Sequence, residues 1–250
     1  MGIVLYELAG DDPDLRFSPH CWKVRMALAH KGLDAESRPW RFIEKDAIAF
    51  SGQSSVPVLV DDGEAVCDSW RIAQHLEARY PDAPALFAGD GAVPLAGFVN
   101  AWADTALLPL IARIILLDVH DCLARADRNY FRASREKYFG RSLEAVVADR
   151  TANLSAVRSA IAPLRQVLKE RAFLSGAVPA YADYCVFGMF MWARCASTAE
   201  LLAEDDPVFD WCDRLLDAFA GLARRAPQVL PAETPVNLVA SSGLERRRKP

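Results

Sequence analysis

The sequence lacks any apolar run long enough to cross a membrane, and its start, MGIVLYELAGDDPD, lacks the basic end and cleavage site of a signal peptide. It also lacks an excess of positive charge, because 29 lysines and arginines stand against 33 acidic residues. A general nucleic-acid binder would show a basic footprint. We therefore expect a cytoplasmic protein that contacts neither a membrane nor nucleic acid.

Paired cysteines are also missing. The six cysteines are scattered along the chain without a CxxC motif, at positions 21, 67, 122, 185, 195 and 212. This spacing is typical of reduced thiols that pack as small apolar side chains in a cytosolic protein. No group of histidines and cysteines has the spacing of a metal site, and the three adjacent residues His120, Asp121 and Cys122 would point in divergent directions from a helix. We expect no bound metal.

The first 82 residues contain several strand patterns. Residues 3–8 (IVLYEL) form a compact apolar run, and residues 37–42 predict a second strand. Residues 56–60 and 65–67 are separated by Asp62-Gly63, a dipeptide typical of a β-hairpin turn. These segments predict a small sheet with at least one antiparallel pair.

Two helices are expected between and after these strands. Ser18 has the chemistry of an N-cap, Pro19 suits the first helical position, and Gly32 stands where a helix would end. Asp68-Ser69 opens a second helical pattern that Pro81 stops. Residues 1–82 are therefore predicted to form an α/β domain.

The rest of the chain reads as helical. Residues 83–92 are rich in proline and glycine and predict a linker before an all-helical domain over residues 93–225. Helical patterns cover 98–123, 135–140, 146–168, 182–196 and 209–222, and Pro163 is expected to kink or divide the third. The nearly all-apolar segment 182–196 is expected to be buried. Residues 226–250 end in ERRRKP and are expected to form a solvated tail.

This order of elements resembles the cytosolic glutathione S-transferases, which join a thioredoxin-like domain to an all-α domain. The likeness rests on Ser18 in SPHCWKVRMAL, on Val56-Pro57 where the family has a cis-proline, and on Asp68-Ser69 at a helix start. Ala180-Tyr181-Ala182-Asp183 resembles the family's capping box, with alanine in place of the usual serine or threonine. That departure predicts a helix less stable by about 1 kcal/mol.

Within this family, one branch is more similar. The segments VPVLVDDGEAVCDSW, RNYFRASREKYFG and AEDDPVFDWCDRLLDAF resemble the bacterial β-etherases and the related fungal class. Those enzymes use glutathione to cleave β-aryl ether bonds in lignin-derived aromatic compounds. The resemblance implies a glutathione transferase of aromatic catabolism, which acts as a homodimer on a small hydrophobic electrophile.

The resemblance also assigns site residues. Ser18 would donate a hydrogen bond to the glutathione sulfur, and the helix start would help to lower the pKa of a thiol that is otherwise about 8.5. The glutathione backbone and γ-glutamyl end would be bound by Ser55, Val56, Pro57, Asp68 and Ser69. Cys21 is the competing reactive group, although a buried packing role is the simpler interpretation.

A hydrophobic substrate pocket is expected between the loop 9–17 and the first long helix of the second domain. Its candidate residues are Phe17, Trp102, Leu107, Leu110 and Ile111. Two alternatives remain at this point. One is a zeta-like maleylpyruvate or maleylacetoacetate isomerase, with Arg16 and Arg113 as carboxylate anchors. The other is a non-catalytic protein that binds glutathione or an aromatic ligand.

Overall fold

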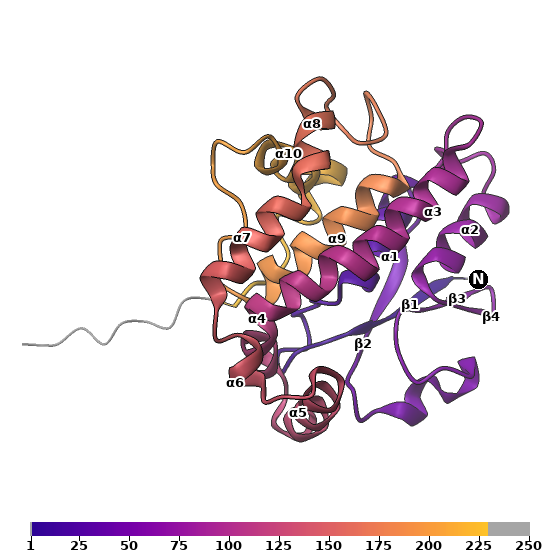
Figure 1. Cartoon of the computed structure of the whole chain (residues 1–250). Helices are drawn as coiled ribbons and strands as arrows, with labels where there is room; N and C mark the ends of the chain where they lie inside the picture. The colour runs from indigo at the N-terminus through magenta and orange to yellow at the C-terminus, as the bar shows by residue number, and fades with distance from the viewer. Residues whose placement is uncertain (1, 230–250) are drawn as a thin grey trace, which may run out of the picture.

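In the computed structural model, which describes residues 2–229, four strands form one mixed sheet (Figure 1). They are β1 (Ile3–Leu8), β2 (Ala35–Trp40), β3 (Val58–Asp61) and β4 (Glu64–Cys67), in the order β2-β1-β3-β4. β1 pairs parallel with β2 and antiparallel with β3, and β3 forms the predicted hairpin with β4. The second strand ends two residues earlier than expected, because Phe42 leaves the sheet and packs against Phe131.

Two α-helices and a 3₁₀ turn complete this part of the chain. They are α1 (Pro19–His30), η1 (Lys45–Ser51) and α2 (Ser69–Arg79). The predicted N-caps are present: the Ser18 hydroxyl accepts from the Cys21 amide at 3.4 Å, and Asp68 accepts from the amides of Trp70 and Arg71 at 3.0 and 3.1 Å. The sheet and its helices have the predicted thioredoxin-like arrangement.

The described residues after α2 contain helices and no further strand. They are α3 (Ala92–Trp102), a π-helical turn η2 (Ala103–Leu107), α4 (Leu108–Cys122), α5 (Arg125–Phe139), α6 (Leu143–Val146), α7 (Arg150–Ala160), α8 (Ala162–Leu168), α9 (Tyr181–Ala196) and α10 (Pro207–Gly221). Pro163 stands in the first turn of α8, so it divides the predicted 146–168 helix. α5 begins ten residues before the predicted start. Of the predicted tail, residues 230–250 lie outside the described part of the chain.

α9 is the buried helix at the centre of the helical part, as its apolar sequence predicted (Figure 1). The Asp183 carboxylate reaches back to the Ala180 amide at 3.1 Å, so one half of the capping box is present despite Ala180. It also accepts from the amides of Leu174 and Ser175 and from the Trp211 indole. One carboxylate therefore holds the start of α9, the preceding loop and α10 together.

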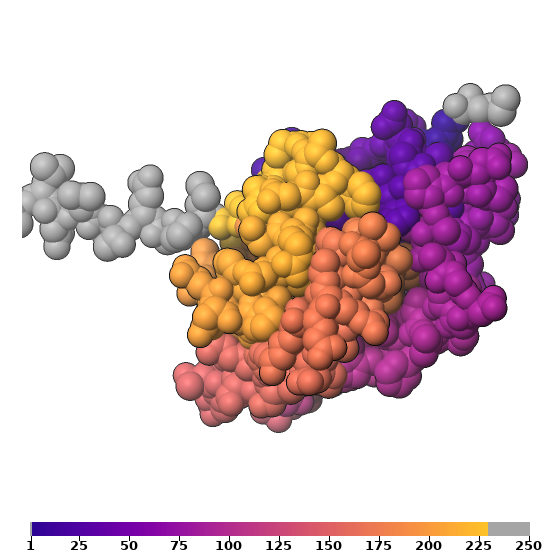
Figure 2. Space-filling model, turned by 90° about the horizontal axis from the view of Figure 1, so that it is seen from above, coloured from indigo at the N-terminus to yellow at the C-terminus, as the bar shows by residue number. Residues whose placement is uncertain are grey.

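The C-terminal end of α10 meets the first helix of the chain. The backbone leaves the helical conformation at Ala218, and Phe219 lies edge-on to His30 and Tyr184. The His30 Nδ1 lies 2.7 Å from the Tyr184 hydroxyl. Figure 2 shows the end of the described chain, in yellow, beside a violet-blue part of the N-terminal region. This contact joins the last helix to the α/β part.

α1 packs directly against α9, and a glycine makes this close approach possible. A Cβ atom at Gly188 of α9 would overlap the carbonyl oxygen of Pro19, the residue after Ser18. The added Cβ would be fixed to the backbone of α9, and the carbonyl oxygen belongs to the backbone of α1. Neither atom can therefore move without shifting a whole helix. Gly188 therefore fixes how closely the helix that carries Ser18 lies to the core.

We expect Gly188→Ala to lower the free energy of unfolding by about 1–3 kcal/mol, the usual range for overpacking. This loss is expected although alanine favours the helical conformation more than glycine does. Gly97→Ala on α3 is the matched control, because its Cβ would lie 3.4 Å from the Trp70 ring, an ordinary contact. Urea unfolding of both variants measures the difference. Equal stability of the two variants would contradict the close packing at Gly188.

Candidate functional site

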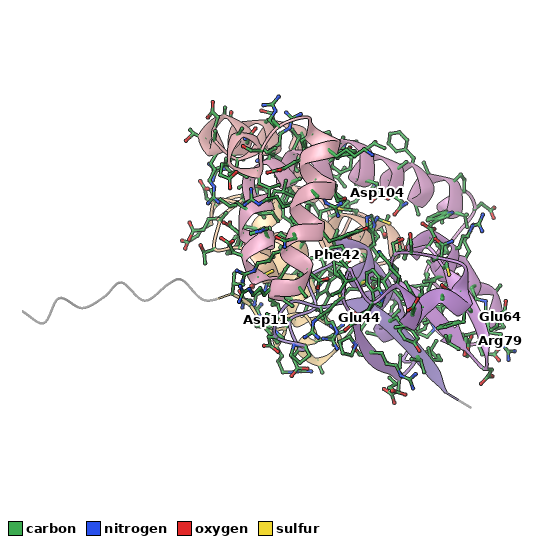
Figure 3. The ribbon with its side chains drawn as sticks, turned by 90° about the horizontal axis from the view of Figure 1, so that it is seen from below. Asp11, Phe42, Glu44, Glu64, Arg79 and Asp104 are labelled. Atoms are coloured by element: carbon green, nitrogen blue, oxygen red, sulfur yellow. The ribbon has the colours of Figure 1, made fainter. Side chains whose placement is uncertain are left out.

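A cavity of about 510 Å³ lies where the start of α1, the segment 40–56 and the helices α4 and α5 meet. Figure 3 shows Phe42 and Glu44 in the region where the sheet meets the helical part. Many of the side chains that line the cavity are aromatic. The lining residues are Leu8, Phe17, Ser18, Pro19, His20, Trp40, Phe42, Lys45, Ser54, Ser55, Val56, Leu108, Pro109, Ala112, Leu116, Val119, Tyr130, Phe131, Arg135, Tyr138, Phe139 and Trp192.

Ser18 lines this cavity at the N-terminus of α1 and is 5% exposed. Its contact with the Cys21 amide, at 3.4 Å, is longer than a typical hydrogen bond. The hydroxyl is therefore only weakly engaged within the protein and can donate to an atom in the cavity. The helix dipole favours negative charge at the same point.

The predicted backbone site lies beside Ser18. The Val56-Pro57 peptide bond is cis, and Val56 precedes Val58, the first residue of β3 that pairs with β1 and β4. Ser55 and Val56 line the cavity, whereas Pro57 does not. The peptide groups that precede β3 thus form one edge of the cavity, where an extended peptide could add as a further strand.

Asp68 and Ser69 lie at the start of α2 and do not line the cavity. Asp68 is exposed and has a φ of 73°, and its Oδ1 accepts both capping hydrogen bonds. The Ser69 side chain is buried, and its backbone carbonyl accepts from the Tyr181 hydroxyl of α9 at 2.7 Å. The geometry leaves Asp68 Oδ2 and the helix N-terminus for a polar ligand group.

Cys21 is fully buried and does not line the cavity. Burial, with a smaller contribution from the nearby Glu7, raises the pKa of its thiol to about 12. At pH 7 a thiol with that pKa is ionised in only about one molecule in 10⁵, and the thiolate is the reactive form. Cys21 is therefore a packing residue, as its simpler interpretation predicted.

The predicted wall residues of the second domain differ from those that line the cavity. Leu107 and Ile111 are fully buried in the core, and Trp102 and Leu110 are partly buried away from the cavity. The α4 side chains that line it belong to a neighbouring face of the helix, namely Leu108, Pro109, Ala112, Leu116 and Val119. Of the predicted pocket residues, only Phe17 lines the cavity.

A polar cluster borders the start of α1. The Lys23 ammonium is buried and donates to Asn100 at 2.8 Å and to Asp104 at 2.6 Å, and Asp104 lies in the π-helical turn η2. His20 lines the cavity, with its Nδ1 3.7 Å from Asp104. Burial and the neighbouring Lys23 lower the pKa of His20 to about 4, so it is neutral at pH 7. A neutral imidazole offers one hydrogen-bond donor and one acceptor near Ser18.

Sequence reasoning missed the cationic and aromatic groups that η1, α5 and α9 contribute to the cavity wall. Arg135 and Tyr130 come from α5, Lys45 from η1 and Trp192 from α9. The segment RNYFRASREKYF mixes basic and aromatic residues, which is a sequence signal for the part of this wall that α5 forms. Among residues 2–229, no group of acidic, histidine or cysteine side chains is arranged to hold a metal ion. None of the helices over the same residues is long and apolar enough to span a membrane.

Comparison with solved structures finds the same fold. A glutathione transferase of Phanerochaete chrysosporium, GSTFuA3, superposes with a TM-score of 0.78 at 24% identity, over 86% of this chain and 96% of that one. A glutathione S-transferase of Ceriporiopsis subvermispora, in complex with glutathione, gives 0.74 at 22% identity, over 88% and 97% of the two chains. At these identities the similarity concerns the fold.

Two curated proteins are similar over shorter regions. Maleylacetoacetate isomerase of Pseudomonas aeruginosa is 41% identical over 81 residues, which is 29% of this chain and 38% of that protein. A glutathione S-transferase-like protein of Aspergillus flavus, ustS, is 26% identical over 141 residues, or 52% of this chain and 51% of that protein. The matches thus span about two-fifths to one-half of these relatives.

Two family models match the chain in succession. Residues 13–84 match the glutathione S-transferase N-terminal domain, and residues 95–220 match the glutathione S-transferase C-terminal domain. The first match contains Ser18, the cis-proline and the start of α2, and the second contains the helices from α3 to α10. The chain belongs to the glutathione S-transferase family.

Proposed function

We propose that this protein binds glutathione and conjugates it, through its sulfur, to a hydrophobic aromatic electrophile in the cavity. The observation that supports this most is the position of Ser18, which lines an aromatic cavity next to the cis Val56-Pro57 peptide. A peptide bound along that edge would place its thiol at the start of α1. The aromatic walls would then hold a second, apolar reactant beside it.

Each part of glutathione has a partner in this proposal. The cysteinyl backbone pairs with the Val56 peptide groups, and Ser55 lies beside them at the cavity edge. The γ-glutamyl carboxylate binds the N-terminus of α2 at Ser69, and Asp68 accepts from its ammonium. The Ser18 hydroxyl donates to the sulfur and stabilises the thiolate. These contacts orient the nucleophile before the electrophile arrives.

The resemblance to the β-etherases gives a specific reaction. The thiolate attacks the carbon that carries an aryloxy group beside a ketone, a C–S bond forms, and the C–O bond breaks. The bonding electrons leave with the aryloxide, which takes a proton from water. The ketone makes that carbon more electrophilic, while the protein supplies orientation and a stabilised thiolate.

An aryl ketone with an aryloxy group on the carbon next to the carbonyl, incubated with glutathione and the protein, tests this reaction. We expect release of the phenol together with the glutathione thioether in equal amounts. If neither product forms while 1-chloro-2,4-dinitrobenzene is conjugated, the proposed etherase reaction is wrong and the proposed transferase function still holds. If glutathione binds by calorimetry but no electrophile reacts, the protein is a binding protein. Absence of glutathione binding would contradict every form of this proposal.

The similarity to a maleylacetoacetate isomerase supports a second candidate, the isomerisation of a maleyl-type acid. The carboxylate anchors expected from the sequence do not lie in the cavity: Arg16 is buried near Glu7, and Arg113 is exposed on α4. Turnover of maleylpyruvate without consumption of glutathione would favour this candidate.

For either function we propose that the protein forms a homodimer. The reason is that α3 leaves the apolar side chains of Leu95 and Phe98 exposed on one side. Light scattering measures the mass of the assembly in solution.

A further inference from the structure

The part of the cavity wall that α5 forms carries an arginine with no acidic partner in the described part of the chain. Arg135 of α5 lies with its guanidinium carbon 5.0 Å from the ring centre of Phe131 and 5.8 Å from that of Phe42. Among residues 2–229, no carboxylate lies within 4.0 Å of it, and its one side-chain hydrogen bond joins Nη1 to the Ser134 hydroxyl. Burial lowers the pKa of Arg135, which means that the cation is partly removed from water.

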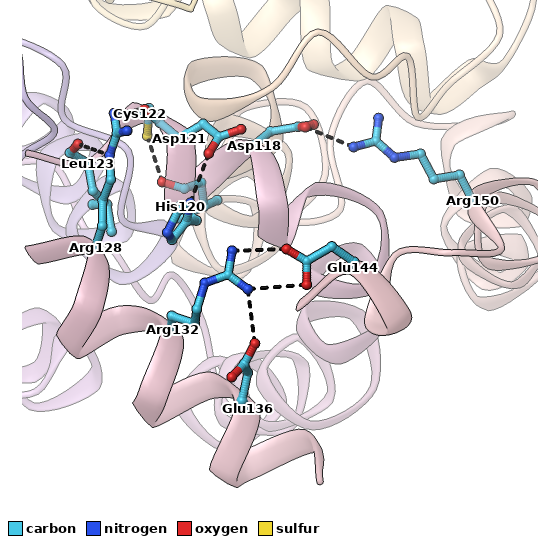
Figure 4. A network of polar contacts seen from close by, with 11 residues as sticks. Asp118, His120, Asp121, Cys122, Leu123, Arg128, Arg132, Glu136, Glu144 and Arg150 are labelled. Carbon is cyan, nitrogen blue, oxygen red and sulfur yellow. Dashed lines mark hydrogen bonds and ion pairs between the residues drawn. The ribbon is translucent and has the colours of Figure 1, made fainter. Parts of the chain in front are cut away.

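Its neighbours on the same helix are different. Arg132, almost one turn earlier, binds Glu136 and Glu144 at 3.0 Å, and Arg128 donates to the carbonyls of Leu123 and Asp121 (Figure 4). Those two arginines hold α5 to its surroundings. Arg135 points into the cavity without such a partner, although a partly desolvated cation is costly unless an anion or polar groups surround it.

A second cation lies in the same cavity. The Lys45 ammonium lies 4.7 Å from the ring centre of Trp40 and 5.1 Å from that of Tyr130, and it donates to the Ser54 carbonyl at 2.5 Å. Lys45 makes no ion pair within the described chain. The aromatic wall therefore carries two positive charges. The cavity can hold an anionic ligand as well as a neutral one.

We propose that the electrophile which occupies this cavity carries an anionic group, a carboxylate in the simplest case, and that Arg135 binds it. The Nε and Nη2 edge of the Arg135 guanidinium makes no hydrogen bond within residues 2–229, and such an edge matches the two oxygens of a carboxylate. The aromatic part of the ligand then lies along Phe42, Tyr130 and the α4 side chains. The substrate class is an aromatic electrophile whose acidic group lies away from the reacting carbon.

The inference rests on the proposed transferase function, and a matched pair of electrophiles tests it. 4-Chloro-3,5-dinitrobenzoate and its methyl ester lose the same chloride to glutathione, opposite the carboxyl group. We expect Arg135→Gln to lower kcat/KM for the benzoate by about 10- to 100-fold, the usual range for a charge-assisted hydrogen bond, and for the ester less than about 2-fold. Arg135→Lys should restore part of the loss. Arg141→Gln, an equal charge change at an exposed position outside the cavity, should change neither.

Glutathione has carboxylates of its own, so its KM is measured in the same experiment. If Arg135→Gln raises the KM for glutathione and lowers both electrophile rates equally, Arg135 binds glutathione and the proposal is overturned. Equal small effects on both electrophiles, as expected of a packing residue, also overturn it.

A binding measurement separates this inference from the transferase function. If the wild type turns over neither electrophile, the quenching of tryptophan fluorescence by 2-naphthoate and by methyl 2-naphthoate is compared, since Trp40 and Trp192 line the cavity. Tighter binding of the naphthoate that disappears in Arg135→Gln supports the anion site even without catalysis. Equal binding of the two naphthalenes to the wild type overturns it.

Discussion

Replacing Ser18 by alanine is expected to lower kcat/KM for glutathione conjugation by about 10- to 100-fold at pH 6.5. A hydrogen bond to a charged group contributes about 1.5–3 kcal/mol, and each pKa unit corresponds to about 1.4 kcal/mol. Loss of the hydroxyl should therefore raise the thiol pKa of bound glutathione by about 1–2 units. The ultraviolet absorbance of the thiolate, titrated against pH with the protein in excess, measures this pKa directly.

The sign of the pH dependence follows from the thiol. The glutathione thiol has a higher pKa in the variant, so at low pH less of the bound glutathione is thiolate than in the wild type. The loss of rate therefore has its full size below the thiol pKa of the wild type. Above about pH 9 an unperturbed thiol is itself mostly ionised, and the two proteins should become more alike. A loss that is constant from pH 6 to pH 9 would mean that Ser18 positions glutathione without stabilising the thiolate.

Two further variants separate the hydroxyl from its surroundings. Ser18→Thr keeps a hydroxyl at the start of α1 and should recover most of the activity. Cys21→Ala removes the buried thiol three residues later and should leave turnover within about 2-fold, because Cys21 does not reach the cavity and its pKa is about 12. Full activity in Ser18→Ala together with loss in Cys21→Ala would make Cys21 the reactive group.

The features that the sequence predicted well are local ones. Ser18 and Asp68 accept from amides two or three residues away, and Pro19 acts through its own fixed φ, so their chemistry can be recognised in a short stretch. The hairpin at Asp62-Gly63 is local in the same sense. The thioredoxin-like order of strands and helices and the all-helical second part followed from such signals and from the family resemblance.

The wall of the cavity could not be predicted in this way. The π-helical turn at Ala103–Leu107 adds about one residue to a turn, and one residue rotates the following side chains by about 100°. Leu107 and Ile111 each stand one position before a lining residue, Leu108 or Ala112, and therefore face about 100° away from the cavity. α4 is also buried on several sides, so an apolar pattern alone does not show which side meets the cavity.

The basic wall was missed because its contacts are distant in the sequence. Arg135 rests on Phe42, and Lys45 rests on Tyr130, so each pair joins the α/β part to α5. α5 began earlier than predicted for a related reason: its only buried residues are Asp127 and Phe131, and Phe131 packs against Phe42. Helical periodicity cannot detect a helix whose apolar face is that narrow.

The largest effect on stability is expected from Asp183. We predict that Asp183→Ala lowers the free energy of unfolding by more than about 3 kcal/mol, because the fully buried carboxylate accepts four hydrogen bonds. Three of its donors are backbone amides of Leu174, Ser175 and Ala180, and the fourth is the Trp211 indole. Without the carboxylate these donors lose their partner, and a cavity opens between α9 and α10.

Asp149→Ala is the matched control, because Asp149 is also a helix cap but is exposed and accepts only from Ala152. Loss of such a cap costs about 1 kcal/mol. Asp183→Asn should fall between the two alanine variants, since the amide keeps one acceptor but turns its NH₂ toward donors. Urea unfolding measures the loss of stability in each variant. If Asp183→Ala and Asp149→Ala unfold at the same urea concentration, the carboxylate is no more than an ordinary cap. A larger loss in Asp183→Ala would show that the stability of the second half depends on this side chain.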